Sequence, residues 1–499
     1  MSELSQAAID YKIERDRYTK LAAEIELRIE DGTTLDDACK QLADIGVSDE
    51  ILRKTREIIE ADIAEKSKLS APLMARLNNS YYDRATKEYL MINERGQYLS
   101  LSTGQYRLYC KQAGLNAKAG KGDRISESDE HIIVLQQTRD VGYSGELAGY
   151  DSGLIEMYGE RILVTRSPMV PEPKPGSWDT IRAIVYGLLG DDSDQPDVFL
   201  WWLKVGYEAL RARKHRPGQA VVLAGPVGIG KSLLQKIVTV VLGGRCAKPY
   251  QYMVGETPFN ADLFCAEHQM IEDEVPSTDI RARRHFGAQI KSLTVNTEQR
   301  CHAKGRTPVM LKPFWRATIS LNDEPEAMQV LPPIDEDVAD KLMLLQCYPF
   351  DFPMPTDTQE DYDALYARIQ AEVPAMCHDL TRMTISQAYV SKRFGVRHYH
   401  HPDLLYAIDR LAPEVQLWEL IEHELLLTDE EWSGGAAELV SALTKGESTV
   451  AHTARSLLRS PQSCGAYLSR LAKRMPGCAI FNRTGANGRE WTLRRAKLV

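Results

Sequence analysis

The stretch GPVGIGKS at residues 225–232 constrains this chain more than any other feature. It fits the pattern G-x-x-x-x-G-K-[ST], the apolar run AVVLA (220–224) precedes it, and LLQKIVTVVLG with helical periodicity follows it. When a buried strand is followed by a glycine-rich turn and then by the start of a helix, backbone N–H groups of the turn point at phosphate oxygens. The sequence therefore predicts a P-loop within an α/β fold.

The residues of this loop have separate roles in the chemistry that the motif requires. The loop comprises Gly225, Pro226, Val227, Gly228, Ile229, Gly230, Lys231 and Ser232. The glycines let the backbone turn its N–H groups onto phosphate oxygens, Lys231 neutralises the β- and γ-phosphates, and Ser232 offers a hydroxyl to magnesium. The predicted cofactors are therefore ATP and Mg²⁺, and the alternative is a glycine-rich turn without function.

A second strand with an acidic end is predicted some forty residues further on, in AEHQMIEDEV. Three adjacent carboxylates, Glu272, Asp273 and Glu274, follow its apolar residues, and such a cluster repels itself unless a cation or a shared proton lies there. We assign Asp273 to magnesium and Glu274 to the activation of water. A register shifted by one, with Glu272 and Asp273 in these roles, and an exposed acidic turn are the alternatives.

A third strand, FWRATISLN, stays apolar until Asn322. In many P-loop ATPases a polar residue at such a strand end helps to orient the attacking water. Asn322 is also a good turn former before DEPE, but its place in the order of motifs favours the functional interpretation.

Proline-rich joints divide the chain, which at 499 residues is too long for one core. SPMVPEPKPGSW has four prolines within residues 168–175, and YPFDFPMP (348–355) is a second joint. We therefore predict five parts, namely a helical module (1–70), a small α/β domain (75–166), the P-loop domain (177–350), a helical region (356–430) and a C-terminal domain (431–499).

The overall composition excludes several classes of protein. With 43% apolar and 26% charged residues, the chain is neither disordered nor fibrous. No basic start followed by an apolar run is present, and no apolar stretch approaches the roughly 20 residues of a membrane span. The nine cysteines are scattered, which favours neither a disulfide framework nor a zinc site. We expect a cytoplasmic protein without a membrane partner.

Residues 281–316 carry nine Lys or Arg against one acidic residue, Glu298. Within them HAKGRTP has strand-like residues on both sides, so a hairpin with Lys304 and Arg306 at its tip is predicted. Such a tip would hold a phosphate backbone without reading bases. The alternative is a solvated charged loop.

The formal net charge of −9 conceals a basic tail, because residues 452–499 contain ten Lys or Arg and one acidic residue. Residues 431–499 read as three short helices followed by two strands around a GANG turn, the order of a winged helix. Duplex DNA is the expected partner of its basic residues, Arg470, Lys473, Arg474, Arg483 and Arg489. A winged helix used only for protein contacts is the alternative.

The order of strand, GPVGIGKS, acidic strand IEDE, basic hairpin AKGR and a strand ending in Asn322 resembles the superfamily III helicases of small viruses, phages and satellite elements. The resemblance covers roughly residues 180–350, and the flanks are loosely similar to C-terminal regions of phage and plasmid primase-helicases. It implies an AAA+ core in a homo-oligomeric ring, usually a hexamer. It also implies ATP hydrolysis between subunits and single-stranded or forked DNA in a pore lined by Lys304 and Arg306.

One departure from this family concerns the arginine finger, the cation that a neighbouring subunit supplies to the γ-phosphate. At the matching place this chain has DVADKLMLL, so the resemblance assigns the role to Lys341. The substitutes are Arg281, Arg283 and Arg284, and the alternative for Lys341 is a surface ion pair with Asp340 or Asp337. The sequence also lacks the marks of a primase domain, so a separate primase or other replication proteins are possible partners.

Together these features predict an ATP-dependent DNA helicase or translocase that acts, as an oligomeric ring, in the replication of a phage, plasmid or satellite element in a bacterial host cell. Two alternatives stay open. One is an origin-binding initiator or loader without processive unwinding, and the other is a defence ATPase triggered by nucleic acid.

Overall fold

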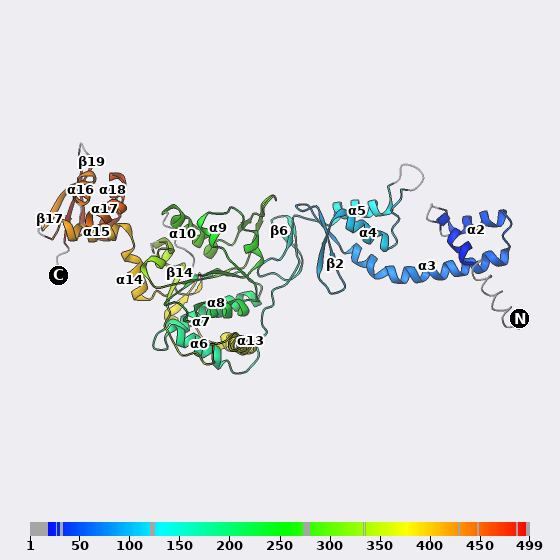
Figure 1. Cartoon of the computed structure of the whole chain (residues 1–499), viewed down its shortest axis with the longest axis horizontal. Helices are drawn as coiled ribbons and strands as arrows, with labels where there is room; N and C mark the ends of the chain where they lie inside the picture. Colours follow the sequence, from blue (N-terminus) through cyan, green and yellow to red (C-terminus); the bar gives the residue numbers. More distant parts are fainter. Residues whose placement is uncertain are drawn as a thin grey trace. The chain divides into compact units, whose positions relative to one another are not determined.

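The computed structural model describes residues 18–25, 27–29, 33–119, 125–272, 280–332, 334, 336–427, 430–446, 449–485 and 488–495 (Figure 1). The chain divides into two compact units. The first comprises residues 1–146, 152–166 and 305–309, and the second comprises 147–151, 167–304 and 310–499. None of the helices in these ranges is long and apolar enough to cross a bilayer.

In the first unit a single 30-residue helix, α3 (Asp49–Asn78), runs through the predicted boundary between the first two domains. Its first half packs on α2 (Leu35–Asp44) in a small apolar cluster that includes Leu52 and Ile59. Its last turns contribute Leu73 and Leu77 to another apolar cluster, which also includes residues of the sheet that follows in the sequence. One helix therefore serves two small cores.

Two small sheets complete this unit, with strand orders β3-β2-β1-β4 and β5-β7-β6. The elements are β1 (Tyr81–Asp83), β2 (Glu88–Ile92), β3 (Tyr98–Leu101), α4 (Thr103–Gln112), α5 (Glu127–Thr138), β4 (Asp140–Val141), β5 (Tyr143–Gly145), β6 (Gly153–Met157) and β7 (Glu160–Val164). Ser102 and Gln105 form a capping box at the start of α4, which satisfies backbone N–H groups there.

A five-stranded parallel sheet is the centre of the second unit, with the order β14-β8-β13-β10-β9. Its strands are β8 (Ala220–Ala224), β9 (Cys246–Ala247), β10 (His268–Glu272), β13 (Arg316–Leu321) and β14 (Leu342–Gln346). The strands predicted at AVVLA, before the acidic cluster and before Asn322 are thus confirmed. The chain is therefore a mixed α/β protein.

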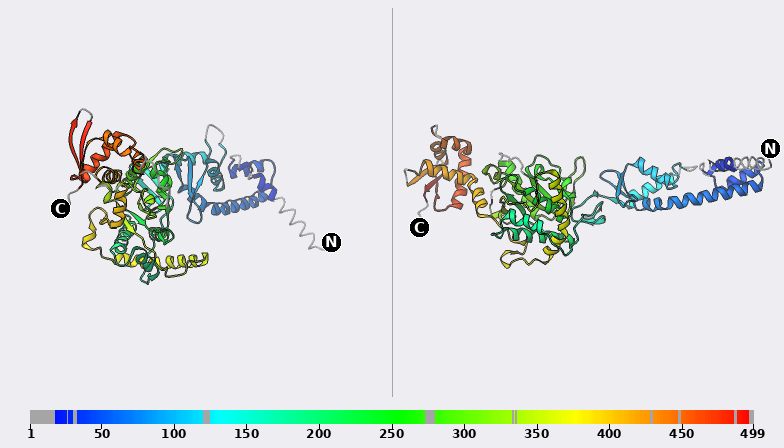
Figure 2. Two further views of the ribbon diagram at one scale, coloured as in Figure 1. Left: turned by 60° about the vertical axis from the view of Figure 1, so that its left-hand side comes forward. Right: turned by 60° about the horizontal axis from the view of Figure 1, so that its bottom comes forward.

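Helices cover both faces of this sheet (Figure 1, and from two further sides in Figure 2). One face packs on α6 (Asp179–Leu189), α7 (Gln195–Arg211), α8 (Lys231–Val241) and α13 (Gln359–Arg382). The other packs on α9 (Tyr250–Val254), α10 (Ile280–Val295) and α14 (Pro402–Arg410). Short elements connect them, namely a 3₁₀ turn (Ala261–Cys265), α11 (Pro325–Met328), α12 (Glu336–Ala339), a second 3₁₀ turn (Gln387–Tyr389), β15 (Val390–Ser391) and β16 (Gly395–Val396).

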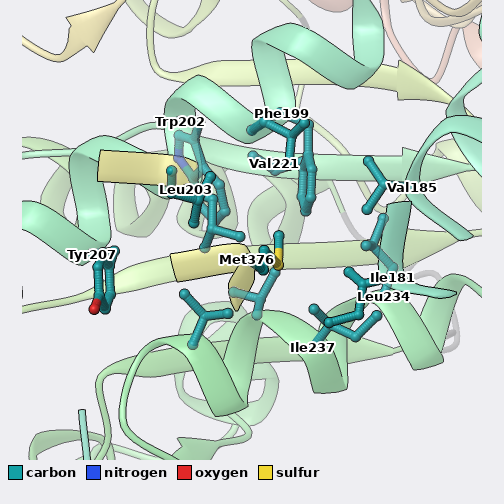
Figure 3. Packing of buried hydrophobic residues seen from close by; sticks show 14 of the residues in the cluster. Ile181, Val185, Phe199, Trp202, Leu203, Tyr207, Val221, Leu234, Ile237 and Met376 are labelled. Atoms are coloured by element: carbon teal, nitrogen blue, oxygen red, sulfur yellow. The ribbon is translucent and has the colours of Figure 1, made fainter. Parts of the chain in front are cut away.

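The two cores follow from the alternation of side chains along β8. Val221 and Leu223 belong to the first cluster, whereas Val222 and Ala224 belong to the second. Figure 3 shows the first cluster, in which Val221 lies among Phe199 and Trp202 of α7 and other apolar side chains. Because both faces of the strand are buried, β8 is apolar throughout and holds the loop that follows it in a fixed position.

The C-terminal region has a core of its own that includes Leu417, Trp418 and Trp491. Its elements are α15 (Pro413–Glu424), β17 (Glu431–Gly435), α16 (Ala436–Thr444), α17 (Thr449–Leu457), α18 (Pro461–Arg474), β18 (Ala479–Gly485) and β19 (Gly488–Arg494). The three helices and the hairpin agree with the sequence-based expectation. The segment WSGG differs, because it pairs with β19 as a third antiparallel strand and only then enters α16.

Candidate functional site

The P-loop lies at the carboxyl edge of the parallel sheet, where ligands of open α/β folds commonly bind. Strand β13 lies between β8 and β10, and its register pairs Leu321 with Ala224 and Ser320 with Glu272. The residues that follow these strands therefore meet at one edge. The Gly225 N–H also donates to the Leu321 carbonyl (3.2 Å), so the P-loop begins beside Asn322.

Glycines are required at three positions of this loop. Gly228 and Gly230 have φ angles of 78° and 100°, in the left-handed region that favours glycine. A β-carbon on Gly225 would overlap the carbonyl oxygen of Cys347, and one on Gly230 would lie 3.0 Å from Phe352 Cζ. The loop therefore has the backbone curvature and close packing of a phosphate cradle.

Lys231 is the first residue of α8, and its ammonium lies over the loop in a buried position. Its Nζ donates to the carbonyl oxygens of Gly225 (2.6 Å) and Pro226 (2.7 Å) and contacts Asn322 Oδ1 at 3.3 Å. Three neutral oxygens thus hold this cation, and no carboxylate is among the partners that the structure gives it. The charge is available to a phosphate, and Lys231 and Asn322 are brought together although 91 positions separate them.

The acidic strand ends at Glu272, whose carboxylate forms an ion pair with Lys248 Nζ. Lys248 is a cation at this edge that sequence reasoning missed, because no motif includes it. Asp273 and Glu274, the preferred magnesium ligand and general base, lie outside the described residues, so their roles remain predictions. Carboxylate and hydroxyl oxygens of Glu272 and Ser232 are ligands that suit Mg²⁺, and the glycine cradle with Lys231 suits a triphosphate.

A buried polar network behind the P-loop connects α8 to both neighbouring strands. Gln235 Nε2 donates to the Ile271 carbonyl (3.1 Å) and to Thr318 Oγ1 (2.8 Å). His268 contacts Thr318 Oγ1 (2.8 Å) and Thr239 Oγ1 (2.7 Å), and burial lowers the pKa of His268 to about 3. The imidazole is therefore neutral, and the network fixes α8 relative to β10 and β13.

A cavity of about 320 Å³ opens beside the P-loop. Its lining combines loop and helix residues with side chains from the segment after β14, namely Gly228, Gly230, Lys231, Ser232, Leu233, Phe352, Thr356 and Tyr362. The sequence indicated only a proline-rich joint at residues 348–355. The aromatic residues in YPFDFPMP were the signal that could have revealed a second function for this segment.

The basic hairpin is formed by β11 (Gln299–Cys301) and β12 (Val309–Leu311), and Lys304 and Arg306 are exposed at its tip. The first strand is shorter than the strand-like residues before HAKGRTP indicate, because α10 continues to Val295 and includes the residues LTV (293–295). Buried Asn260 anchors the first strand through a bond to the Arg300 carbonyl (3.0 Å) and two bonds with the backbone of His302 (3.1 and 2.7 Å). Asn260 thus holds the end of the first strand, next to the tip that carries the two cations.

Lys341 lies at the opposite, amino end of the sheet, directly before β14. Its Nζ forms an ion pair with Asp340 (2.5 Å), and 13% of its side chain is exposed. The ion pair with Asp340 was the alternative to its role as a finger. The side chains of the substitutes Arg281, Arg283 and Arg284 lie outside the described residues, so the finger remains a proposal.

The basic residues of the C-terminal region fall into two groups. Arg470 and Arg474 of α18 form ion pairs with Glu414 (3.5 and 3.8 Å), and Arg474 also pairs with Asp409 of α14 (2.6 Å). Lys473 and Arg489 are exposed, and Arg489 contacts Ser469 Oγ at 3.3 Å. The Arg483 side chain lies outside the described residues. Two of the predicted DNA contacts therefore also hold α18 against neighbouring helices.

Comparison with known proteins shows a likeness of fold. Neither a scan against protein-family models nor a search of curated proteins gave a match. Among solved structures the chain is similar to the apo structure of the NrS-1 C-terminal region, with 12% identity and a TM-score of 0.50 over 84% of this chain and 96% of that one. An A-form apo structure of the same region has a TM-score of 0.49, with 12% identity over 83% of this chain and 96% of that one. At this identity the likeness concerns the fold alone.

Proposed function

We propose that the chain is an ATP-dependent DNA helicase or translocase of the superfamily III, AAA+ type, acting as an oligomeric ring in the replication of a phage, plasmid or satellite element. The observation that carries the proposal is the contact between Lys231 and Asn322 at the carboxyl edge of a sheet in the order β14-β8-β13-β10-β9. A strand that ends in a polar amide lies between the P-loop strand and the acidic strand. This arrangement serves phosphate-bond hydrolysis, in which positioning and electrostatics supply most of the catalysis.

In this proposal each residue at the edge has a defined task. The loop N–H groups and Lys231 bind the phosphates and offset the charge that develops on the γ-phosphate. The Asn322 Oδ1 atom faces Lys231, which leaves its amide N–H groups to orient water. Bound Mg²⁺ would supply Lewis-acid stabilisation of the phosphate oxygens, and Ser232, Glu272 and Asp273 would hold it.

Coupling to DNA is assigned to the hairpin between the acidic strand and β13. Because Lys304 and Arg306 are exposed and the hairpin base is anchored by Asn260, the tip can hold a DNA backbone while its base is fixed to the ATPase core. The likeness to the NrS-1 C-terminal region covers 84% of the chain and therefore supports a common fold over most of its length.

The test of this proposal is DNA-stimulated ATP hydrolysis by the full chain. We expect phosphate release that requires Mg²⁺, increases several-fold with single-stranded DNA and disappears in the Lys231→Ala variant. Hydrolysis that persists in Lys231→Ala, or a wild-type protein without ATPase activity, would contradict the proposal.

A second candidate function, an initiator or loader, is favoured by one observation. The C-terminal region combines three helices with an antiparallel sheet and exposes Lys473 and Arg489, which suits duplex DNA. A protein that hydrolyses ATP and binds duplex origins but separates no strands would fit this function better.

A further inference from the structure

The lining of the cavity beside the P-loop combines two chemically different kinds of group. Gly228, Gly230, Lys231 and Ser232 supply loop backbone, a cation and a hydroxyl, whereas Phe352 and Tyr362 supply aromatic rings next to the hydroxyl of Thr356. Its volume of about 320 Å³ lies in the range of small-molecule pockets. A nucleoside triphosphate has the same division, because its charged phosphates are joined through a sugar to a flat aromatic base.

Phe352 is held in place by its neighbours Phe350 and Gly230. Its ring centroid lies 4.7 Å from that of Phe350, with 43° between the planes, and a β-carbon on Gly230 would lie 3.0 Å from Phe352 Cζ. Phe350 in turn packs so closely on α6 that a β-carbon on Gly187 would lie 2.5 Å from its Cδ2 atom. The ring of Phe352 is therefore half-buried and fixed, so stacking a base on it would cost little conformational entropy.

Tyr362 is positioned by the helix that follows the P-loop. Lys236 Nζ donates to the Tyr362 hydroxyl (2.8 Å) and lies 5.1 Å from the ring centroid, and this bond raises the pKa of Lys236. An ammonium group only donates hydrogen bonds, so the hydroxyl oxygen is the acceptor. The hydroxyl proton of Tyr362 remains able to donate to a ligand.

We propose that Phe352 and Tyr362 form the base-binding end of the nucleotide site, with Phe352 stacking against a purine ring. This inference rests on the proposed function, because it requires a nucleotide at the P-loop. Thr356 offers a hydroxyl that can donate or accept and Tyr362 offers a donor, and both purines carry ring nitrogens that accept, so these two side chains do not distinguish adenine from guanine. We therefore expect ATP and GTP to bind with similar affinity, and CTP and UTP to bind more weakly because their smaller rings stack less.

The experiment compares the binding of ATP with that of inorganic triphosphate, which lacks a base, to the full chain. In Phe352→Leu the apolar contacts to Gly230 and Phe350 persist while the aromatic face is lost. We expect this variant to bind ATP about tenfold more weakly and to bind triphosphate as wild type does, since base stacking on an aromatic side chain has about this magnitude. Phe352→Trp should restore ATP binding, and Tyr406→Ala, at an exposed tyrosine of α14, is the control.

Three results would contradict the inference. ATP binding unchanged in Phe352→Leu would exclude stacking on this ring. Equal losses of ATP and triphosphate binding would show that Phe352 acts through the P-loop, where it contacts Gly230, and CTP binding equal to ATP binding would exclude a purine site. A wild-type protein that binds ATP with these preferences but hydrolyses none would instead contradict the proposed function, so the two failures are distinguishable.

Discussion

The sequence predicts functional residues both at the carboxyl edge of the five-stranded sheet and on the last helix, α18. In the structure these two sets of residues have different surroundings. At the sheet edge, Lys231 Nζ lies 3.3 Å from Asn322 Oδ1, although the two residues are 91 positions apart in the sequence. On α18, Arg470 and Arg474 meet the carboxylates of Glu414 and Asp409. The order of the strands brings the motif residues to one edge of the sheet. The positive charge of a surface residue, by contrast, does not show whether that residue binds an acidic group of the protein itself or one of a partner.

The largest effect on ATP hydrolysis is expected from a substitution of Lys231, at the centre of the site at the carboxyl edge of the sheet. Lys231→Ala removes a side-chain cation that the structure places over the loop, and ATP hydrolysis should fall by about a hundredfold or more, because loss of a positioned charge or donor has such effects. Phosphate release at saturating Mg²⁺ and ATP measures this. ATPase activity within a few-fold of that of the wild-type protein would show that the P-loop is not the site of ATP hydrolysis.

Much of this edge was predictable from the sequence, and the reason is local. The apolar run 220–224, the glycines and the periodic helix are contiguous, so β8, the loop and α8 could be placed to within a few residues. Asn322 could also be predicted, because it directly follows the last apolar residue of a predicted strand. Lys248 could not be predicted in the same way, because tertiary folding brings it to the site and no sequence motif includes it. For Phe352 the sequence offered only the aromatic residues of YPFDFPMP, without a motif that links them to the P-loop.

The C-terminal region shows the limit of charge as a signal. Its three helices and its hairpin follow from periodicity and turn residues, but the partners of Arg470 and Arg474 come from α14 and α15, about sixty residues earlier. The strand β17 was missed because WSGG has no strand alternation, and its backbone pairing with β19 determines its conformation.

Asn322→Ala should reduce the turnover of ATP by about tenfold or more while ATP binding changes little. Its amide contacts Lys231 and would orient water, so its loss affects the transition state more than the ground state. Asp323→Ala, at the exposed neighbouring position, is the matched control. A rise in KM without a fall in kcat would assign Asn322 to substrate binding and weaken its link to the P-loop.

The finger proposal predicts an effect between subunits. Lys341→Ala subunits mixed into wild-type rings should reduce ATPase activity by more than their fraction, because each would disable the site of its neighbour while still binding ATP. Asp340→Ala, which removes the partner of Lys341, should leave the mixture near proportional. A strictly proportional decline for Lys341→Ala, with a disproportionate one for Arg283→Ala or Arg284→Ala, would move the finger to α10.

Variants of the hairpin tip should separate ATP hydrolysis from its response to DNA. Lys304→Ala and Arg306→Ala should retain basal ATPase activity and lose most of its stimulation by single-stranded DNA, because both cations are exposed and belong to the hairpin. Lys111→Ala, an exposed lysine of α4, controls for loss of positive charge in general. Equal stimulation in the tip variants and the control would exclude the hairpin as the DNA contact.

The smallest effects are expected on α18, where adjacent residues offer a direct comparison. Lys473→Ala should weaken duplex binding a few-fold and reduce the slope of log K against log salt by about one, as expected when one phosphate contact is lost. Arg474→Ala should change this slope less, because Asp409 and Glu414 already engage the guanidinium. An equal or larger change for Arg474 would show that DNA displaces these carboxylates.

The central claim is that ATP turnover at the sheet edge drives the separation of DNA strands. The direct measurement is unwinding of a forked duplex by the full chain, followed together with phosphate release in the same reaction. The account predicts strand separation that requires ATP and Mg²⁺, fails in Lys231→Ala, and fails in Lys304→Ala despite continued basal hydrolysis. Normal ATP hydrolysis without strand separation on any fork, 3′- or 5′-tailed, would contradict it.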